Sequence, residues 1–162
     1  MKNKLLIITS VALFFIIPLY AGDIEDSIIV TKHNKNLTIK DIAEIQPGLG
    51  TVMMEFGHRF HIIYYAAKAN NWKLAQYELK ELVEAQEIAE TTRPKYKKQL
   101  KEFEDNYLKI LQDSIDAENW KKFEKQYSKV TNACNTCHEM NGHPYIKYEL
   151  PIEEPKYLRM YL

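Results

Sequence analysis

The chain has little of the residue chemistry that marks several common classes of protein. Only two of its 162 residues are cysteines, which is too few for a scaffold held together by disulfides. It lacks an excess of either charge, since 22 basic residues balance 22 acidic ones, and no basic block offers a surface for nucleic-acid phosphates. A charged fraction of 27% and 11 tyrosines argue against a disordered or multispanning chain. The composition therefore predicts one compact, soluble domain, and its two cysteines need an explanation.

A long hydrophobic run occurs only at the N-terminus. Two lysines precede the apolar stretch 5–20, and Ala21 offers a small residue at a cleavage position. This order is typical of a secretory signal peptide, here residues 1–21. The alternative is a retained membrane anchor, which needs about 20 apolar residues, whereas Pro18 breaks this shorter run near its end. The sequence therefore predicts export to the periplasm and no membrane attachment after cleavage.

The rest of the chain divides into three parts. Residues 22–47 predict an extended N-terminal arm, with a β-branched run at 28–31 and one helical turn near 41–45. Residues 48–142 have a helical pattern almost throughout. Residues 143–162 contain three prolines and four tyrosines, which predicts an extended C-terminal tail that crosses the surface of the domain.

Capping residues divide the helical region into four helices. Asn71 and Asn119 can each accept a hydrogen bond from the first turn of a helix, and Pro94 suits a first turn because it has no N–H to leave unpaired. The segment 69–73 recurs in similar form at 117–121, and each copy would open the second helix of a hairpin. The predicted fold class is all-α, an antiparallel up-down-up-down four-helix bundle, because short loops make neighbouring helices antiparallel. The four helices are expected at 49–69, 72–91, 94–116 and 120–140.

Apolar residues at alternating spacings of three and four give each predicted helix one face for the core. The charged residues fall mostly between these positions, which predicts a solvated outer face. The predicted core positions, helix by helix, are Leu49, Met53, Phe56, Phe60, Ile63 and Ala67; Leu79, Leu82 and Gln86; Leu100, Phe103, Tyr107, Ile110 and Ser114; and Trp120, Phe123, Tyr127, Val130, Cys134 and Cys137.

Both cysteines belong to the run Cys134-Asn135-Thr136-Cys137-His138, which is C-x-x-C-H, the attachment signature of a c-type haem. The two thiols would add across the two vinyl groups of the porphyrin, and the histidine would supply an imidazole to the iron. On a helix, the positions i, i+3 and i+4 project from one face. A structural zinc site needs about four ligands, and the chain has no second cysteine pair. The motif therefore predicts one haem c per chain, with a plain disulfide or dithiol as the alternative.

An exported helical bundle with this motif near the end of its last helix resembles the cytochrome c-prime group of class II c-type cytochromes. The resemblance covers about residues 48–142 as topology, and only Cys134, Cys137 and His138 as residues. It implies a bundle fold, covalent haem and His138 as the proximal iron ligand. The chain departs from that group in the roughly 20 residues that follow the haem helix, so ligand access and dimerisation do not carry over from it.

The sixth iron ligand is expected from the start of the first helix, which would lie beside the end of the fourth in an antiparallel bundle. On a helical wheel Met53 falls on the core face, whereas Met54, His58 and His61 point away from it. Met53 is the favoured distal ligand, because a thioether is a recognised axial ligand. The alternatives are a histidine ligand, Met53 as a core filler, and an open site. An open site would have an apolar lining of Leu49, Phe56 and Phe60.

We therefore predict a monohaem c-type cytochrome that exchanges single electrons with partner proteins. No enzymatic activity is expected, because no paired carboxylates, nucleophile–base pair or second metal site accompanies the motif. Two alternatives remain open. One is a five-coordinate haem protein that binds a small gas such as nitric oxide or carbon monoxide, and the other is a helical partner-binding module with a structural haem. The oligomeric state is left open, with a dimer as one option.

Overall fold

The structure is a computed structural model that describes residues 27–30, 32 and 36–156. The predicted signal peptide, 1–21, and the last six residues of the tail lie outside the described residues. Most of the described chain is helical, which is compatible with the all-α class. The chain divides into two compact units, 1–45 and 46–162.

The described part of the first unit contains a short sheet and a short helix. Strand β1 (Ile28–Val30) pairs antiparallel with β2 (Asn36–Thr38), and helix α1 (Ile39–Glu44) follows directly. Thr38 begins α1 with a capping box: its Oγ1 accepts from the Asp41 N–H at 3.0 Å, and its own N–H donates to Asp41 Oδ2 at 2.8 Å. The predicted arm contained a β-branched run and a helical turn but no strand pairing. Strands of three residues are too short to show an alternating pattern, so the sequence did not reveal the sheet.

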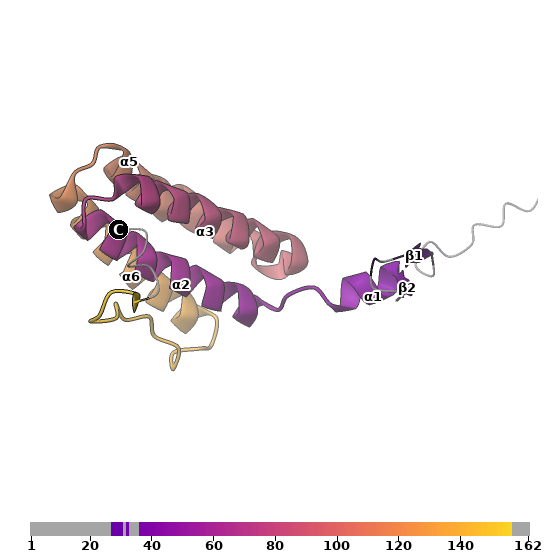
Figure 1. Cartoon of the computed structure of the whole chain (residues 1–162). Helices are drawn as coiled ribbons and strands as arrows, with labels where there is room; N and C mark the ends of the chain where they lie inside the picture. The colour runs from indigo at the N-terminus through magenta and orange to yellow at the C-terminus, as the bar shows by residue number, and fades with distance from the viewer. Residues whose placement is uncertain (1–26, 31, 33–35, 157–162) are drawn as a thin grey trace, which may run out of the picture. The chain divides into compact units, whose positions relative to one another are not determined.

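Four long helical segments make up the second unit (Figure 1). Their bounds agree with the predicted helices to within one residue at each end. The segments are α2 (Leu49–Lys68); α3 (Trp72–Thr92); a third that consists of the 3-10 turn η2 (Pro94–Tyr96), α4 (Lys97–Phe103), the π-helix η3 (Glu104–Leu108) and α5 (Lys109–Asp116); and α6 (Trp120–Met140).

The predicted capping residues begin these helices. The Asn71 side chain accepts a hydrogen bond from the Leu74 N–H at 3.2 Å. The Asn119 side chain accepts one from the Lys122 N–H at 2.9 Å. Pro94 opens the third segment, where the missing N–H leaves no hydrogen bond unmade. These local signals explain why the helix bounds could be read from the sequence.

The two copies of the internal repeat form turns of the same kind. The residue before each capping asparagine has a positive φ, 60° at Asn70 and 48° at Glu118. Each turn also satisfies the end of the helix before it. The Asn71 N–H donates to the Ala66 carbonyl at 2.8 Å, and the Asn119 N–H donates to the Ser114 carbonyl at 3.3 Å. The repeated sequence therefore encodes a repeated helix–turn–helix geometry.

The helices of the second unit pack in a consistent order. Helix α2 lies against α3, α3 lies against α4 and α5, α5 lies against α6, and α6 returns to α2. Figure 1 shows α2 and α3 side by side along most of their length. Within the described residues, no helix is long and apolar enough to cross a membrane.

Most predicted core positions are buried or half-buried. The buried ones are Phe56, Phe60, Ile63, Ala67, Leu79, Leu82, Gln86, Leu100, Ser114, Phe123, Tyr127 and Val130. The half-buried ones are Leu49, Met53, Phe103, Trp120, Cys134 and Cys137.

Two predicted core positions in the third segment are wrong. Tyr107 and Ile110 are 37% and 43% exposed, whereas Leu108, Leu111 and Ile115 are at most 1% exposed. The cause is the π-helix η3, whose hydrogen bonds join residues five apart instead of four and so add one residue to the turn. The buried face beyond it is therefore shifted by one position along the sequence.

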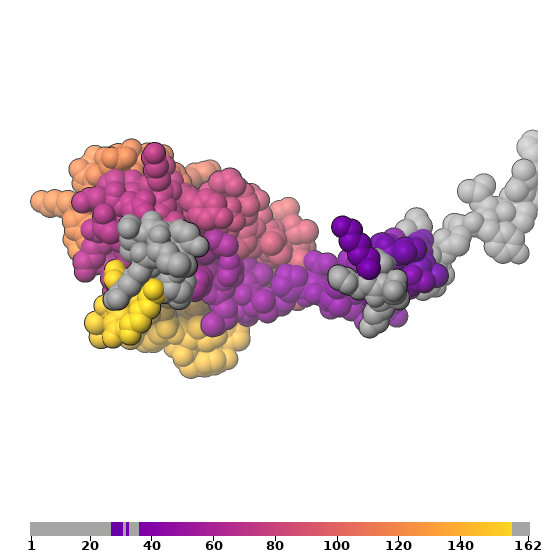
Figure 2. Space-filling view, viewed as in Figure 1, coloured from indigo at the N-terminus to yellow at the C-terminus, as the bar shows by residue number. Residues whose placement is uncertain are grey.

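The described part of the tail comprises residues 143–156, and residues 143–155 form no helix or strand. It lies against α2 and α6 (Figure 2). The Tyr65 hydroxyl is 2.7 Å from the Pro151 carbonyl, and His61 Nε2 is 3.0 Å from the Glu153 carbonyl. Its distal half is therefore attached to α2 through polar contacts with its backbone.

Candidate functional site

A cavity of about 970 Å³ lies in the second unit, where α2 begins, α3 ends and α6 ends. Its walls come from α2, α3, the third helical segment, α6 and the tail. Most of the side chains that line it are apolar or aromatic. Among them are Leu49, Met53, Phe56 and Phe60 from α2, Leu100 and Phe103 from α4, and Tyr145, Ile146 and Tyr148 from the tail.

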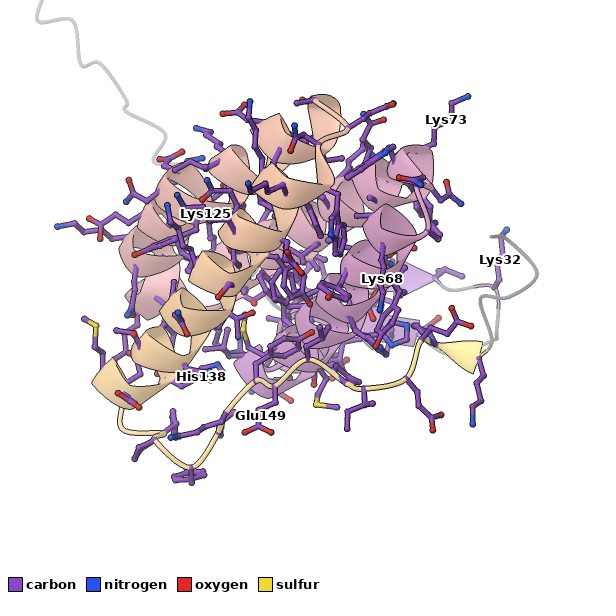
Figure 3. All side chains as sticks on the ribbon, turned by 90° about the vertical axis from the view of Figure 1, so that its left-hand side faces the viewer. Lys32, Lys68, Lys73, Lys125, His138 and Glu149 are labelled. Atoms are coloured by element: carbon purple, nitrogen blue, oxygen red, sulfur yellow. The ribbon has the colours of Figure 1, made fainter. Side chains whose placement is uncertain are left out.

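The C-x-x-C-H motif supplies the α6 wall of this cavity. Cys134, Cys137 and His138 all line it, as expected for positions i, i+3 and i+4 on one helical face. Figure 3 shows His138 near the end of α6, with the tail passing close to it. The structure therefore directs the three chemically distinctive side chains of the motif into one space.

The two thiols differ from those of a reactive dithiol. Both cysteines are free, and burial raises the pKa of Cys134 to about 12. Burial also raises the pKa of Cys137 above its ordinary value. Redox-active C-x-x-C pairs have the opposite property, a lowered pKa that favours the nucleophilic thiolate. The surroundings of Cys134 and Cys137 therefore lack the lowered pKa that is typical of a redox-active pair.

The imidazole of His138 is fixed by a contact with the tail. Its Nδ1 lies 2.9 Å from the carbonyl oxygen of Ile146. A carbonyl can only accept, so Nδ1 carries the proton and donates it in this hydrogen bond. The proton on Nδ1 leaves the lone pair on Nε2, which is the nitrogen that remains to bind a metal. Metal-binding histidines commonly have such a second hydrogen bond, which fixes the tautomer and the ring orientation.

The two methionines that were considered as a sixth iron ligand differ in how deeply they lie in the cavity. Met53 is half-buried and lines the cavity with Phe56 and Phe60. Met54 also reaches the cavity, but it is 77% exposed and lies at the rim.

Neither candidate histidine of α2 is among the lining residues. His58 is exposed, and the ring of His61 faces the Glu153 carbonyl. Burial lowers the pKa of His61 below its ordinary value. The structure therefore brings Met53, and not the two histidines of α2, to the cavity that His138 lines.

Two contacts beside the cavity were missed from the sequence, and Gln86, a predicted core residue, makes a polar contact there that was not foreseen. Asn135, which occupies a variable position of the motif, binds the backbone of Tyr148. Ile146 supplies the carbonyl that fixes His138. Gln86 is fully buried beside the cavity, and its Nε2 donates to the Leu100 carbonyl at 3.0 Å. Asn135 and Ile146 act across a loop, and no spacing rule would reveal those contacts.

The size and chemistry of the cavity fit a haem. Protein interiors are close-packed, and a largely apolar space of this size has room for a bound group. Cofactor pockets commonly have volumes of roughly 300–1,000 Å³, and this one lies at the upper end. Two thiols, an imidazole with its Nε2 lone pair available and a thioether line the same walls. These are the donors that covalent attachment and axial ligation of a haem iron require.

Comparisons with known protein families, with curated proteins and with solved structures found no match for this chain. The residues and the geometry of the cavity are therefore the basis on which a function is inferred.

Proposed function

We propose that this chain is a periplasmic monohaem c-type cytochrome that transfers single electrons. Cys134 and Cys137 would hold the haem covalently, and His138 would be the proximal iron ligand. The observation that carries this proposal is that all three residues line one wall of a 970 Å³, largely apolar cavity. The signal-peptide pattern of residues 1–21 supports the location.

We infer that the scaffold is an antiparallel up-down-up-down four-helix bundle, the fold of the cytochrome c-prime group. The support is the closed order of helix contacts, from α2 through α3 and α5 to α6 and back to α2, together with the short turns at 69–71 and 117–119. In such a bundle the start of α2 lies beside the end of α6. That arrangement accounts for the presence of Met53 and His138 at the same cavity.

When bound, a haem supplies an iron that exchanges one electron between its ferrous and ferric states. The protein residues set the conditions for that exchange. His138 donates its Nδ1 proton to Ile146 and keeps Nε2 for the metal. Met53 would supply a second protein donor to the iron, which would leave no position open for a gas. Phe56 and Phe60, at 7% and 0% exposed, exclude water from the α2 side of the cavity and so favour the less charged ferrous state.

Gas binding is the second candidate function, and the apolar lining favours it. If Met53 only fills space, Leu49, Phe56 and Phe60 leave an uncharged pocket that admits nitric oxide or carbon monoxide. The two candidates differ in one property, which is whether a protein donor occupies the sixth position.

The test uses the full chain, expressed with a cytochrome c maturation system and purified. Intact mass should show one covalently attached haem. The variants Cys134→Ala and Cys137→Ala should each lose a thioether bond, while Thr136→Ala in the same motif should retain both. A wild-type protein without attached haem would overturn the proposal.

Optical spectra then separate the two functions. Electron transfer predicts a low-spin ferrous spectrum that carbon monoxide does not change. Met53→Ala should open the site, so its ferrous spectrum should become high-spin and respond to carbon monoxide. Met54→Ala is the matched control, because Met54 adjoins Met53 in sequence but is 77% exposed, and it should behave as wild type. A wild-type spectrum that shifts with carbon monoxide would replace electron transfer by gas binding.

A further inference from the structure

We propose that Asn135 is a positioning residue for the axial histidine. It holds the tail at Tyr148, and the tail in turn presents the Ile146 carbonyl to His138 Nδ1. This inference rests on the proposed haem ligation by His138, but it concerns a residue that the attachment motif leaves variable and a tail that the motif does not include.

The side chain of Asn135 forms hydrogen bonds with both backbone groups of one tail residue, Tyr148. The Tyr148 N–H donates to Asn135 Oδ1 at 2.7 Å, and Asn135 Nδ2 donates to the Tyr148 carbonyl at 3.1 Å. Two antiparallel neighbours in a β-sheet exchange the same pair of hydrogen bonds. Because the two bonds run in opposite directions, they fix the orientation of the Tyr148 peptide groups as well as their distance from α6. A single hydrogen bond would leave the tail free to rotate about it.

The ring of Tyr148 provides a second attachment to the core. The buried Tyr127 hydroxyl donates to the Phe60 carbonyl at 2.9 Å. Its one proton is used there, so the Tyr148 hydroxyl donates to Tyr127 across the 2.8 Å that separate their oxygens. The Tyr148 ring also lies 5.1 Å from the Phe60 ring, measured between centroids. The tail is thus attached at Tyr148 through both its backbone and its side chain.

The position of Tyr148 determines the position of Ile146. Only one residue, Lys147, lies between them, and the Ile146 N–H donates to the His143 carbonyl at 3.0 Å, which closes a turn before it. The Ile146 carbonyl then lies 2.9 Å from His138 Nδ1. Asn135 and His138 are three residues apart on α6 and so lie on neighbouring positions of one face. Two side chains of α6 therefore bind the tail: Asn135 binds the backbone of Tyr148, and His138 donates a hydrogen bond to the Ile146 carbonyl.

This arrangement has a measurable consequence for the iron. A hydrogen bond from Nδ1–H to a carbonyl makes the imidazole a more basic ligand, and a more basic ligand stabilises the ferric state. The tail would stay attached beyond Tyr148 in a variant without the Asn135 carboxamide, because Tyr65 and His61 contact the carbonyls of Pro151 and Glu153. The main effect of such a variant should therefore be on the Ile146–His138 hydrogen bond.

The experiment compares the wild-type holoprotein with Asn135→Ala and with Thr136→Ala. Thr136 occupies the other variable position of the motif and is exposed, so it is the matched control. In Asn135→Ala the ferrous-to-ferric ratio at a fixed solution potential should rise on the order of tenfold, which corresponds to about 59 mV for one electron. Hydrogen exchange at 145–149 should become faster, while exchange in α2 and α3 stays unchanged. Thr136→Ala should match wild type in both measurements.

The outcomes separate this inference from the proposed function. If the wild-type protein attaches no haem, the proposed function is overturned. If haem attaches and Asn135→Ala has the wild-type potential and the wild-type exchange, the positioning role is overturned. A lower potential in Asn135→Ala also overturns it, because that sign means that the tail acts only as a shield against water.

If Asn135→Ala yields no holoprotein, exchange in the wild type decides. The Tyr148 amide must then be protected, and a rapidly exchanging Tyr148 amide contradicts the inference.

Discussion

The two ends of the second unit are built from the same helices but are filled differently. At the end near the turns 69–71 and 117–119, here called the closed end, four aromatic side chains meet in the core. Centroid distances there are 5.5 Å for Tyr64–Trp120, 6.0 Å for Trp72–Phe123 and 5.7 Å for Trp120–Phe123. At the other end, here called the open end, Leu49 and the residues around it line the 970 Å³ cavity.

The two ends differ in how their apolar side chains are packed. At the closed end the aromatic rings contact one another directly. The open end has apolar walls that face each other across a space and lack contact partners on that side. A bound group that fills the space would restore those contacts and stabilise the folded state by mass action. The C-x-x-C-H motif, which we propose holds such a group, lies at the open end.

The largest expected effect is damage to the closed end. Phe123 is fully buried and touches the rings of Trp72, Trp120 and Tyr127. Phe123→Ala should lower the free energy of unfolding by about 3–5 kcal/mol, because the cavity that it leaves cannot collapse among rigid rings. Urea unfolding of the full chain measures this. Tyr145→Ala at the rim of the open end is the control, since Tyr145 is 77% exposed, and a change of similar size there would contradict the comparison.

A second prediction concerns the π-helix η3, which lies between the part of the third segment that lines the cavity and the part packed at the closed end. Deleting Asn106, which is exposed within η3, removes the extra residue and lets a regular α-helix keep Leu108, Leu111 and Ile115 buried. The unfolding free energy should change by less than about 1 kcal/mol.

A deletion outside η3 should behave differently. Deleting the exposed Asp113 turns Ile115 away from the core by about 100° and should cost about 3 kcal/mol or more. Thermal unfolding of the two deletion variants gives the comparison. Equal losses would show that η3 does not set the register of this segment.

The pH dependence of stability tests Tyr127, which connects the two ends. Burial raises the pKa of the Tyr127 hydroxyl far above its ordinary value near 10. The unfolded chain therefore loses this proton first, and the unfolding free energy should fall as pH rises above about 10, by about 1.4 kcal/mol per pH unit. Tyr127→Phe lacks this contribution, but it loses the hydrogen bonds to Phe60 and Tyr148.

The variant should therefore be less stable than wild type by about 1 kcal/mol at pH 8, and the two should become equally stable near pH 11. Urea unfolding across this range measures the difference. A difference that stays constant from pH 8 to pH 11 would contradict the role given to the buried hydroxyl.

Features that depend on residues close together in the sequence were predicted correctly, whereas features that depend on packing between distant residues were not. The helix bounds depend on local signals such as Asn71, Asn119 and Pro94, and they were predicted to within one residue. Beyond Phe103 the predicted core positions Tyr107 and Ile110 were wrong, because a π-turn depends on packing and leaves no spacing signal of its own. The sequence did contain a second apolar series, Leu108, Leu111 and Ile115, that fits the shifted register.

The candidate site shows the same division. Helical periodicity placed Cys134, Cys137, His138 and Met53 on faces that do line one cavity. The contacts of Asn135 with the tail were not predicted. A side-chain amide that hydrogen-bonds to the backbone of a distant residue leaves no recognisable pattern in the sequence. The size of the cavity was not predicted either, because it depends on the distance between its walls and not on which residues line them.

The smallest expected change in unfolding free energy comes from substitutions in the two repeated turns of the closed end. Glu118 has a φ of 48°, a left-handed conformation that costs a residue with a side chain about 1 kcal/mol relative to glycine. Glu118→Gly should therefore raise the unfolding free energy by up to about 1 kcal/mol. Asn70→Gly, at the same place in the other copy, should gain less, because asparagine tolerates this conformation better. If the proposed haem binds at the open end, both gains should appear equally with and without it, and a gain confined to the haem-loaded protein would show that the two ends are coupled.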